Sequence, residues 1–152
     1  MLRRMHRPRL RSTLVLVCSA LACSSEPPDD SPMGQAIAAL MERPEISAEK
    51  VKVAHVLIQF KGASRSDATR TREEARTLAA EIFARAQKGE DFTALMKKYS
   101  DDTAEGVYEF KRGDMVRRFC DVSFRLQVGE IGVAAHQASR CPYGWHVIKR
   151  LQ

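Results

Sequence analysis

Residues 51–58 read Val51-Lys52-Val53-Ala54-His55-Val56-Leu57-Ile58, which is the clearest β-strand pattern in the chain. Its β-branched residues favour an extended backbone, and so short a run with few polar side chains suits a strand that is buried on much of both faces. A histidine inside such a strand needs hydrogen-bond partners. The sequence therefore predicts a core strand that carries His55 into the interior.

A helix is predicted after the loop that follows this strand. Thr71 and Glu74 have the spacing of a capping box at its start, and Gly89 closes it. Between these ends, apolar residues recur at helical spacing at Ala75, Leu78, Ala79, Ile82, Phe83 and Ala86. Asp91 can then cap a second, short helix that runs to Tyr99.

The following stretch predicts one or two helical turns and then a strand. The helical turns should include Phe119, Phe124 and Leu126. Residues 128–132 read Val-Gly-Glu-Ile-Gly, which is typical of a turn into a strand near Val133.

The last strand is predicted at residues 145–151, after a Pro-Tyr-Gly turn. Its alternation sends Trp145 and Val147 to one face and His146 and Ile148 to the other. Two histidines, His55 and His146, thus lie on strands that could pair in one sheet, where the two side chains could hydrogen-bond each other. The order of elements predicts an α+β domain with a small antiparallel sheet.

The composition fits one modest domain and argues against nucleic-acid binding. The chain has 152 residues, of which 44% are apolar, so it can bury a core. The formal net charge is +6, but five arginines lie within the first 11 residues. Without these five, the chain has 20 basic and 19 acidic residues, so its body is nearly neutral. No nucleic-acid partner is therefore expected.

The first 22 residues are typical of a secretory signal peptide, because an Arg-rich start precedes an apolar stretch that ends in Ala20-Leu21-Ala22. Cys23 directly follows this pattern and resembles the lipid-modified cysteine of bacterial lipoproteins. The alternative is ordinary cleavage after Ala22, because Ala20 and Leu21 stand in the reverse of the usual lipoprotein order. Lipidation at Cys23 would anchor the protein in a membrane, and Ser24 favours the outer membrane, with the protein facing the periplasm.

A tether is predicted after this cysteine. Residues 24–32 contain three prolines, three acidic residues and three serines, with no apolar residue. A short helix is expected at residues 33–42, either as part of the tether or as a flap on the domain. The predicted organisation is a signal peptide at 1–22, a lipidated cysteine, tether and short helix at 23–50, and a folded domain at 51–152.

Metal and nucleophile chemistry have little support in the sequence. Beyond carboxylates, the candidate metal ligands are Cys120, His136, Cys141 and His146. They form no short-spaced motif such as C-x-x-C or H-E-x-x-H, and no G-x-S-x-G motif occurs, so neither a metal or other cofactor nor a hydrolase is expected. Cys120 and Cys141 could form a disulfide in an oxidising compartment or remain two separate buried thiols, and both alternatives stay open.

Five sequence blocks resemble, in the same order, those of the parvulin-type peptidyl-prolyl isomerases. They lie at Val53–Ile58, Phe92–Asp101, Phe110–Met115, Phe119–Ile131 and Tyr143–Lys149. The resemblance covers residues 51–152. It implies the parvulin (FKBP-like) fold, a four-stranded antiparallel sheet surrounded by helices, and isomerisation of Xaa-Pro bonds without a cofactor.

The resemblance also implies the residues of the site. The proline-ring pocket corresponds to Val107, Met115 and Phe119, with Val107 where leucine is usual. The catalytic polar lining corresponds to His55, Asp102, Tyr143 and His146. The G-G-D-L-G segment of the family is replaced by Glu105-Gly106-Val107-Tyr108-Glu109, which keeps a single glycine and predicts an altered pocket rim.

The expected function is that of a monomeric peptidyl-prolyl isomerase that helps exported, proline-containing polypeptides to fold in the bacterial cell envelope. The alternative is a catalytically weak lipoprotein of the same fold that holds clients or docks to a partner. Basic residues follow the first histidine at Lys61, Arg65, Arg70 and Arg72. Gln59 stands where phosphate-selective parvulins have a lysine, so we expect a solvated basic rim and no large preference for phosphorylated substrates.

Overall fold

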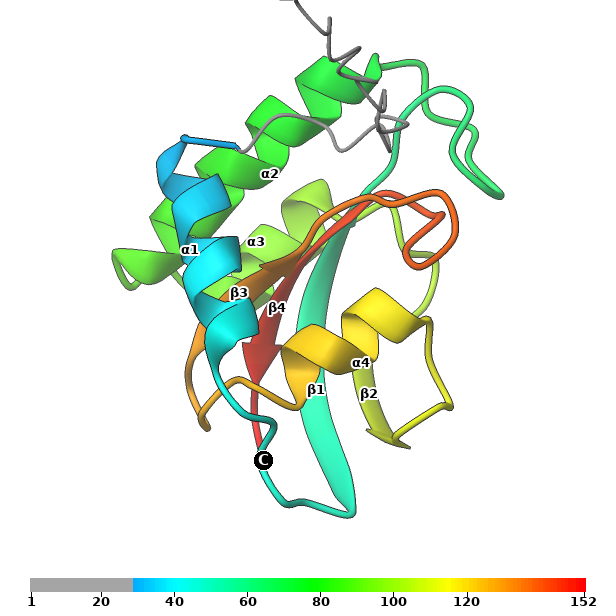
Figure 1. Ribbon diagram of the computed structural model, residues 1–152. Helices are drawn as coiled ribbons and strands as arrows, with labels where there is room; N and C mark the ends of the chain where they lie inside the picture. Colours follow the sequence, from blue (N-terminus) through cyan, green and yellow to red (C-terminus); the bar gives the residue numbers. More distant parts are fainter. Residues whose placement is uncertain (1–28) are drawn as a thin grey trace, which may run out of the picture.

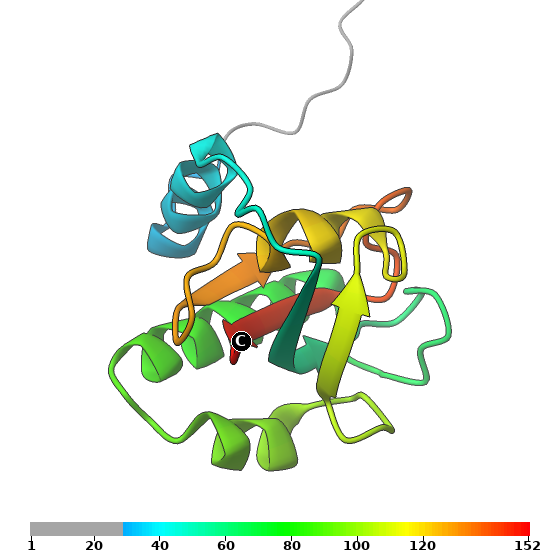
Figure 2. The same cartoon turned by 90° about the horizontal axis from the view of Figure 1, so that it is seen from below.

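The structure is a computed structural model that describes residues 29–152, so the predicted signal peptide, Cys23 and most of the tether lie outside the described residues. The described part is a four-stranded antiparallel sheet with four helices (Figures 1 and 2). Its elements are α1 (Pro32–Glu42), β1 (Lys50–Ile58), α2 (Arg72–Gln87), α3 (Phe92–Tyr99), β2 (Val107–Lys111), α4 (Arg117–Ser123), β3 (Ile131–Ala134) and β4 (Trp145–Arg150). The predicted α+β class is confirmed.

The strand order β2-β1-β4-β3 makes β1 and β4 the two central strands. Their antiparallel register sets His55 opposite Ile148 and His146 opposite Leu57. Because side chains alternate between the two faces of a strand, both histidines lie on the same face. The alternation predicted for the last strand is confirmed, since Trp145 and Val147 pack in the core on the other face.

Each face of the sheet has its own helices and its own core. Helices α2 and α3 cover one face, and α4 covers the other (Figure 2). The capping box predicted at the start of α2 is present, because the Thr71 hydroxyl accepts from the Glu74 N–H and the Glu74 carboxylate accepts from the Thr71 N–H. The Asp91 side chain likewise caps α3 by accepting from the Thr93 and Ala94 N–H groups.

Helix α1 belongs to the folded domain and not to the tether. Met33 and Leu40 are 3% and 5% exposed and pack in the two cores. The helix lies against β3, α2 and α4, and the Ser31 hydroxyl caps it by accepting from the Gly34 N–H at 3.1 Å (Figure 1). The folded unit therefore begins before residue 51, where the sequence placed its start, because α1 buries apolar side chains against it.

The sequence patterns left two further elements incompletely defined. Helix α4 ends at Ser123, so Phe124 and Leu126 are buried just beyond it and not within it. Strand β2 was implied by the resemblance and not by a residue pattern; it is a five-residue edge strand.

The two cysteines of the domain are free thiols, and both are buried. Burial raises the pKa of the Cys141 thiol to about 12, although the nearby Arg118 lowers it slightly. Cys141 therefore stays a protonated, unreactive part of the core at neutral pH. Within residues 29–152, no helix is both long and apolar enough to cross a membrane.

Candidate active site

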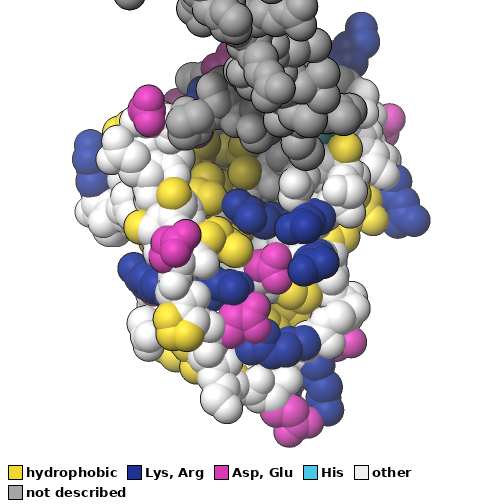
Figure 3. Space-filling view, in the orientation of Figure 1, with side chains coloured by type: hydrophobic (Ala, Val, Ile, Leu, Met, Phe, Trp, Pro, Cys, Tyr) yellow, Lys and Arg dark blue, Asp and Glu magenta, His cyan; other side chains and the backbone are white. Residues whose placement is uncertain are grey.

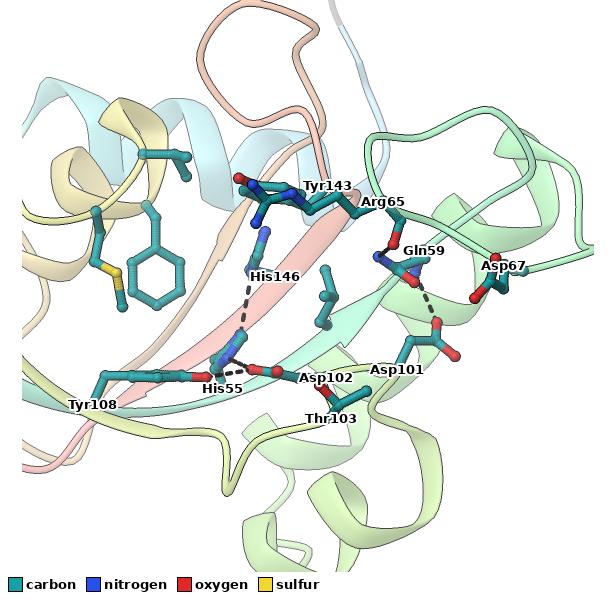
Figure 4. Close-up of a pocket in the computed structure, with 15 residues that line it drawn as sticks. His55, Gln59, Arg65, Asp67, Asp101, Asp102, Thr103, Tyr108, Tyr143 and His146 are labelled. Carbon is teal, nitrogen blue, oxygen red and sulfur yellow. Dashed lines mark hydrogen bonds and ion pairs between the residues drawn. The ribbon is translucent and has the colours of Figure 1, made fainter.

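A cavity of about 660 Å³ opens on the sheet face that carries both histidines. Apolar side chains at and just before the start of α4 line part of it: Met115, Val116 and Phe119. Polar side chains line the rest, from the loop after β1 and from the segment that follows α3 (Figure 4). The cavity thus joins an apolar surface to a polar one around the two imidazoles.

The histidines form a buried hydrogen-bonded chain that ends on a carboxylate (Figure 4). His55 Nδ1 lies 3.1 Å from His146 Nδ1, and His55 Nε2 lies 2.8 Å from Asp102 Oδ2. The Tyr108 hydroxyl donates to the same Asp102 oxygen at 2.8 Å. The hydrogen-bonded group therefore has four members. His55 comes from β1, His146 from β4 and Asp102 from the segment after α3, and Tyr108 from β2 joins them at the carboxylate.

The ionisation of these groups follows from their burial. Desolvation lowers the pKa of His55, although Asp102 partly opposes this effect. Desolvation lowers the pKa of His146 to about 3, with a further contribution from repulsion by His55. Burial alone would raise the pKa of Asp102, but hydrogen bonds from the Ala104 N–H, Tyr108 and His55 outweigh it and the pKa is lowered. At neutral pH the site holds two neutral imidazoles and one carboxylate.

These charge states fix the direction of the hydrogen bonds. An ionised carboxylate only accepts, so His55 Nε2 carries a proton and donates to Asp102. His55 Nδ1 then holds a lone pair and accepts from the Nδ1–H of His146. His146 Nε2 is left with a lone pair, and this buried atom has no hydrogen-bond partner among the described residues. The chain of donors therefore runs towards Asp102 and leaves an acceptor at its far end.

Phe119 holds both imidazole rings from the α4 side. Its ring meets His55 edge-on at a centroid distance of 5.3 Å, and it meets His146 in the same way at 5.2 Å. The side chain is 3% exposed, yet it also lines the cavity. One phenylalanine thus fixes the histidines and forms part of the apolar surface.

Asp102 is positioned by residues 100–102, which bond to the end of β1 that lies beyond its pairing with β2. The Leu57 N–H donates to the Ser100 hydroxyl at 3.1 Å, and the Asp101 N–H donates to the Leu57 carbonyl at 2.8 Å. The Asp101 carboxylate accepts from the Gln59 N–H at 2.8 Å and pairs with Arg70. Two residues therefore dock the segment, and the third presents its carboxylate to His55.

The comparisons with known proteins agree with this geometry. The family model described as the PPIC-type PPIase domain matches residues 37–152. The chain belongs to this family, the parvulin-type peptidyl-prolyl isomerases. The expected parvulin fold is confirmed, because a solved peptidyl-prolyl isomerase from Candida albicans has the same fold, with a TM-score of 0.57 and 24% identity over 78% of this chain and 74% of that one.

Two curated relatives of this parvulin domain carry names that refer to protein folding. The foldase protein PrsA of Caldanaerobacter subterraneus is 42% identical over 76 residues, which cover 47% of this chain and 24% of that protein. The chaperone SurA of Hahella chejuensis is 32% identical over 133 residues, which cover 83% of this chain and 28% of that protein. The chain thus spans about a quarter of the length of these relatives.

Most of the residues that the parvulin resemblance implied come together, but Val107 does not. His55, Asp102, Met115, Phe119, Tyr143 and His146 all line the cavity. Val107 lines a separate cavity of about 530 Å³ beside α3, and Tyr108 takes its place. The cause is the register of β2: Tyr108 pairs with Val53 on the face of His55, whereas Val107 pairs with Ala54 on the opposite face. The placement of Val107 in the proline-ring pocket is therefore corrected.

The altered rim segment has a defined backbone. Gly106 has φ of +69°, and a Cβ at this position would lie 3.1 Å from the His55 carbonyl oxygen. Its own carbonyl accepts from the His55 N–H at 2.8 Å, which starts the pairing of β2 with β1. The glycine that remains is thus the one that the turn into β2 requires.

The candidate metal ligands named from the sequence do not form a metal site in the part of the chain that the structure describes. Within residues 29–152, no group of three or more His, Cys, Asp or Glu side chains is arranged to hold a metal ion. His136 lines a different cavity from His146, between α1 and α2.

The pKa of His146 predicts how stability depends on pH. A histidine whose pKa falls from 6.5 to about 3 on folding contributes stability above pH 6.5 that is lost as the pH falls towards 3. We expect the free energy of unfolding to decrease over this range by up to about 1.4 kcal/mol per pH unit for each such group. His146→Gln should remove the part of this slope that is due to His146, measured by denaturant unfolding between pH 7 and 4.

Equal slopes in wild type and His146→Gln would contradict the buried neutral state of His146.

Proposed function

We propose that this domain isomerises Xaa-Pro bonds of exported polypeptides in the cavity described above. The observation that carries the proposal is the chain from Asp102 through His55 to His146, which lies beside the apolar surface of Met115 and Phe119. A proline ring needs such an apolar surface, and its amide carbonyl needs a lining that does not hold it in the planar state.

Rotation about a prolyl amide is slow because resonance keeps the bond planar, with a barrier of about 18–20 kcal/mol. The twisted transition state has lost this resonance, and its carbonyl oxygen carries less negative charge than that of the planar amide. A site that holds the ring and removes water from the carbonyl therefore favours the twisted form, and no nucleophile is required. Asp102 acts through His55 by fixing its proton; it is too weakly nucleophilic to suggest a covalent step.

The names of the relatives, a foldase and a chaperone, support a role in protein folding. The signal-like residues 1–22 support export, and Cys23 supports a lipid anchor that places the domain at the outer membrane, facing the periplasm. On this proposal the partners are unfolded or extended proline-containing polypeptides, and the domain acts as a monomer.

The first test is the isomerisation of a prolyl peptide by the purified chain. Phe119→Ala should lower kcat/KM by about tenfold or more, which corresponds to about 1.4 kcal/mol of lost transition-state stabilisation. Met115→Ala should cause a smaller loss, because Met115 is only partly buried, whereas Phe119 is buried and also packs on both histidines. Both variants should be compared at equal folded fraction, measured by circular dichroism.

Val107→Ala tests whether Val107 contacts the substrate in the proline-ring pocket, as the family resemblance implies, or lies outside this pocket, in the cavity beside α3. If Val107 lies outside the cavity, this variant keeps the wild-type kcat/KM.

No activity in the wild-type chain, together with undiminished client binding in Phe119→Ala, would favour the alternative of a client-holding protein.

Of the four basic residues that follow β1, at Lys61, Arg65, Arg70 and Arg72, one is a candidate for substrate contact. The Arg70 guanidinium pairs with Asp101, and the Arg72 guanidinium lies 6.0 Å from the centre of the Trp145 ring. Of the lysines and arginines described by the structure, Arg65 alone lines the cavity. Its backbone is held with φ of +52°, and its carbonyl accepts from Gln59 Nε2 at 3.2 Å.

A single exposed arginine predicts a weak preference for acidic residues before proline. One such ion pair contributes about 0.2–1 kcal/mol, so Glu-Pro and phosphoserine-Pro peptides should exceed Ala-Pro by less than about fivefold. The advantage should fall with added salt and disappear in Arg65→Gln. Turnover of the three peptides at low and high salt measures it, and a hundredfold preference for the phosphopeptide would overturn this expectation.

Lipidation is tested on the protein extracted from membranes. Mass spectrometry should show an N-terminal Cys23 that carries acyl chains, and Cys23→Ser should shift the protein to the soluble periplasmic fraction. An unmodified, soluble chain that begins at Cys23 would replace the anchor with ordinary export.

A further inference from the structure

Tyr108 is the member of the hydrogen-bonded group to which the family resemblance gave no role. Its hydroxyl donates to Asp102 Oδ2 at 2.8 Å, and the same oxygen accepts from His55 Nε2 at 2.8 Å. The Tyr108 ring also lies against the His55 ring, with centroids 5.4 Å apart. Figure 4 shows its hydroxyl directed at the Asp102 carboxylate, next to His55.

We propose that Tyr108 is a positioning residue of the active site, whose hydroxyl orients the Asp102 carboxylate and thereby fixes the tautomers of His55 and His146. This inference rests on the proposed isomerase function and assigns a residue that sets the geometry of the same site. The rim segment that departs from the family pattern is, on this view, what supplies the tyrosine.

Asp102 needs a second donor because it stands on an exposed turn. Residues 103–105 are exposed, and the Asp102 side chain is itself 17% exposed. Its Oδ1 accepts from the Ala104 N–H at 3.1 Å, within the same turn. In the part of the chain that the structure describes, the side chains that donate to Oδ2 are His55 and Tyr108. Without the tyrosine hydroxyl, the carboxylate would be tied to the rest of the domain through His55 alone.

The two histidines transmit the orientation of this carboxylate. A neutral imidazole has two tautomers, and its hydrogen-bond partners select between them. If His55 carried its proton on Nδ1, it would face the Nδ1–H of His146, and one of the two protons would have to move. A loosely held Asp102 therefore leaves both imidazoles free to exchange tautomers, and the lone pair on His146 Nε2 is no longer fixed.

Within residues 29–152, the hydroxyl that donates to the Asp102 carboxylate is that of Tyr108. The Ser100 hydroxyl accepts from the backbone N–H groups of Leu57 and Asp102, so it holds the segment and not the carboxylate. Tyr143 lines the cavity, but the carboxylate accepts from Tyr108. The register that pairs Tyr108 with Val53 is what brings its side chain to this face.

The test uses Tyr108→Phe, which keeps the ring and removes the hydroxyl. In the full wild-type chain, ¹⁵N NMR of the imidazoles at neutral pH should show single tautomers, with protons on His55 Nε2 and His146 Nδ1. In the variant, the shifts should move towards the average of two tautomers. Because the ring remains, KM should stay within about twofold while kcat falls about three- to tenfold, as expected when an interaction that acts on the transition state is lost.

Tyr99→Phe is the matched control, because its hydroxyl accepts from Arg85 on α2 and the side chain does not line the cavity. It should leave the imidazole shifts and kcat unchanged. Unchanged tautomers in Tyr108→Phe would overturn the inference, even with a lower kcat, since the hydroxyl would then act on the substrate directly. A wild-type chain that turns over no prolyl peptide would contradict the proposed function, whereas the imidazole shifts would still decide the role of Tyr108.

Discussion

The hydrogen bond between His55 and His146 is the interaction on which the cavity side of the domain depends. It joins the two central strands inside the core, where a charged imidazole would be costly and a neutral one needs both a donor and an acceptor. A pair of histidines cannot satisfy all of its ring nitrogens: the chain continues to a third group at the His55 end, and His146 Nε2 at the other end has no partner among the described residues. The segment after α3 returns to the sheet and supplies Asp102, and α4 covers the remaining ring surfaces with Phe119.

The same segment also shapes the outer rim of the cavity. Asp101 docks on the end of β1 through Gln59 and pairs with Arg70 at the end of the following loop. Gln59 in turn holds the carbonyl of Arg65. The surface on which a substrate would lie and the buried histidine chain therefore share one support. A change in this segment would alter the substrate rim and the histidines together, as is expected where binding residues on loops are positioned by a rigid scaffold (Figure 4). On the face of the molecule seen in Figure 3, basic and acidic side chains lie next to one another among hydrophobic ones.

Local patterns were enough to predict β1, β4 and α2, because strand alternation, the capping box and helical spacing each depend on residues that are close together in the sequence. The histidine pair followed from the same patterns. The face of β2 did not, because both Val107 and Tyr108 could face a core, and only pairing with Val53 decides between them. The docking of α1 could not be predicted from a local pattern either, because it depends on a contact between distant residues. Leu40 packs on β3 at Gly132, where a Cβ would lie 2.9 Å from the leucine side chain.

The buried polar chain is not what a stable core alone requires, because apolar side chains of similar volume would fill the same space without a desolvation penalty. Its chemical value lies in what it presents at the cavity wall. A cation or a row of N–H donors would stabilise the carbonyl oxygen of the planar amide, which carries more negative charge than that of the twisted form. His146 lines this wall as a neutral imidazole and so places no positive charge there, and its buried Nε2 carries no proton to donate. This part of the wall therefore does not stabilise the planar amide. The free-energy difference between the planar and the twisted amide is not increased, as isomerisation requires.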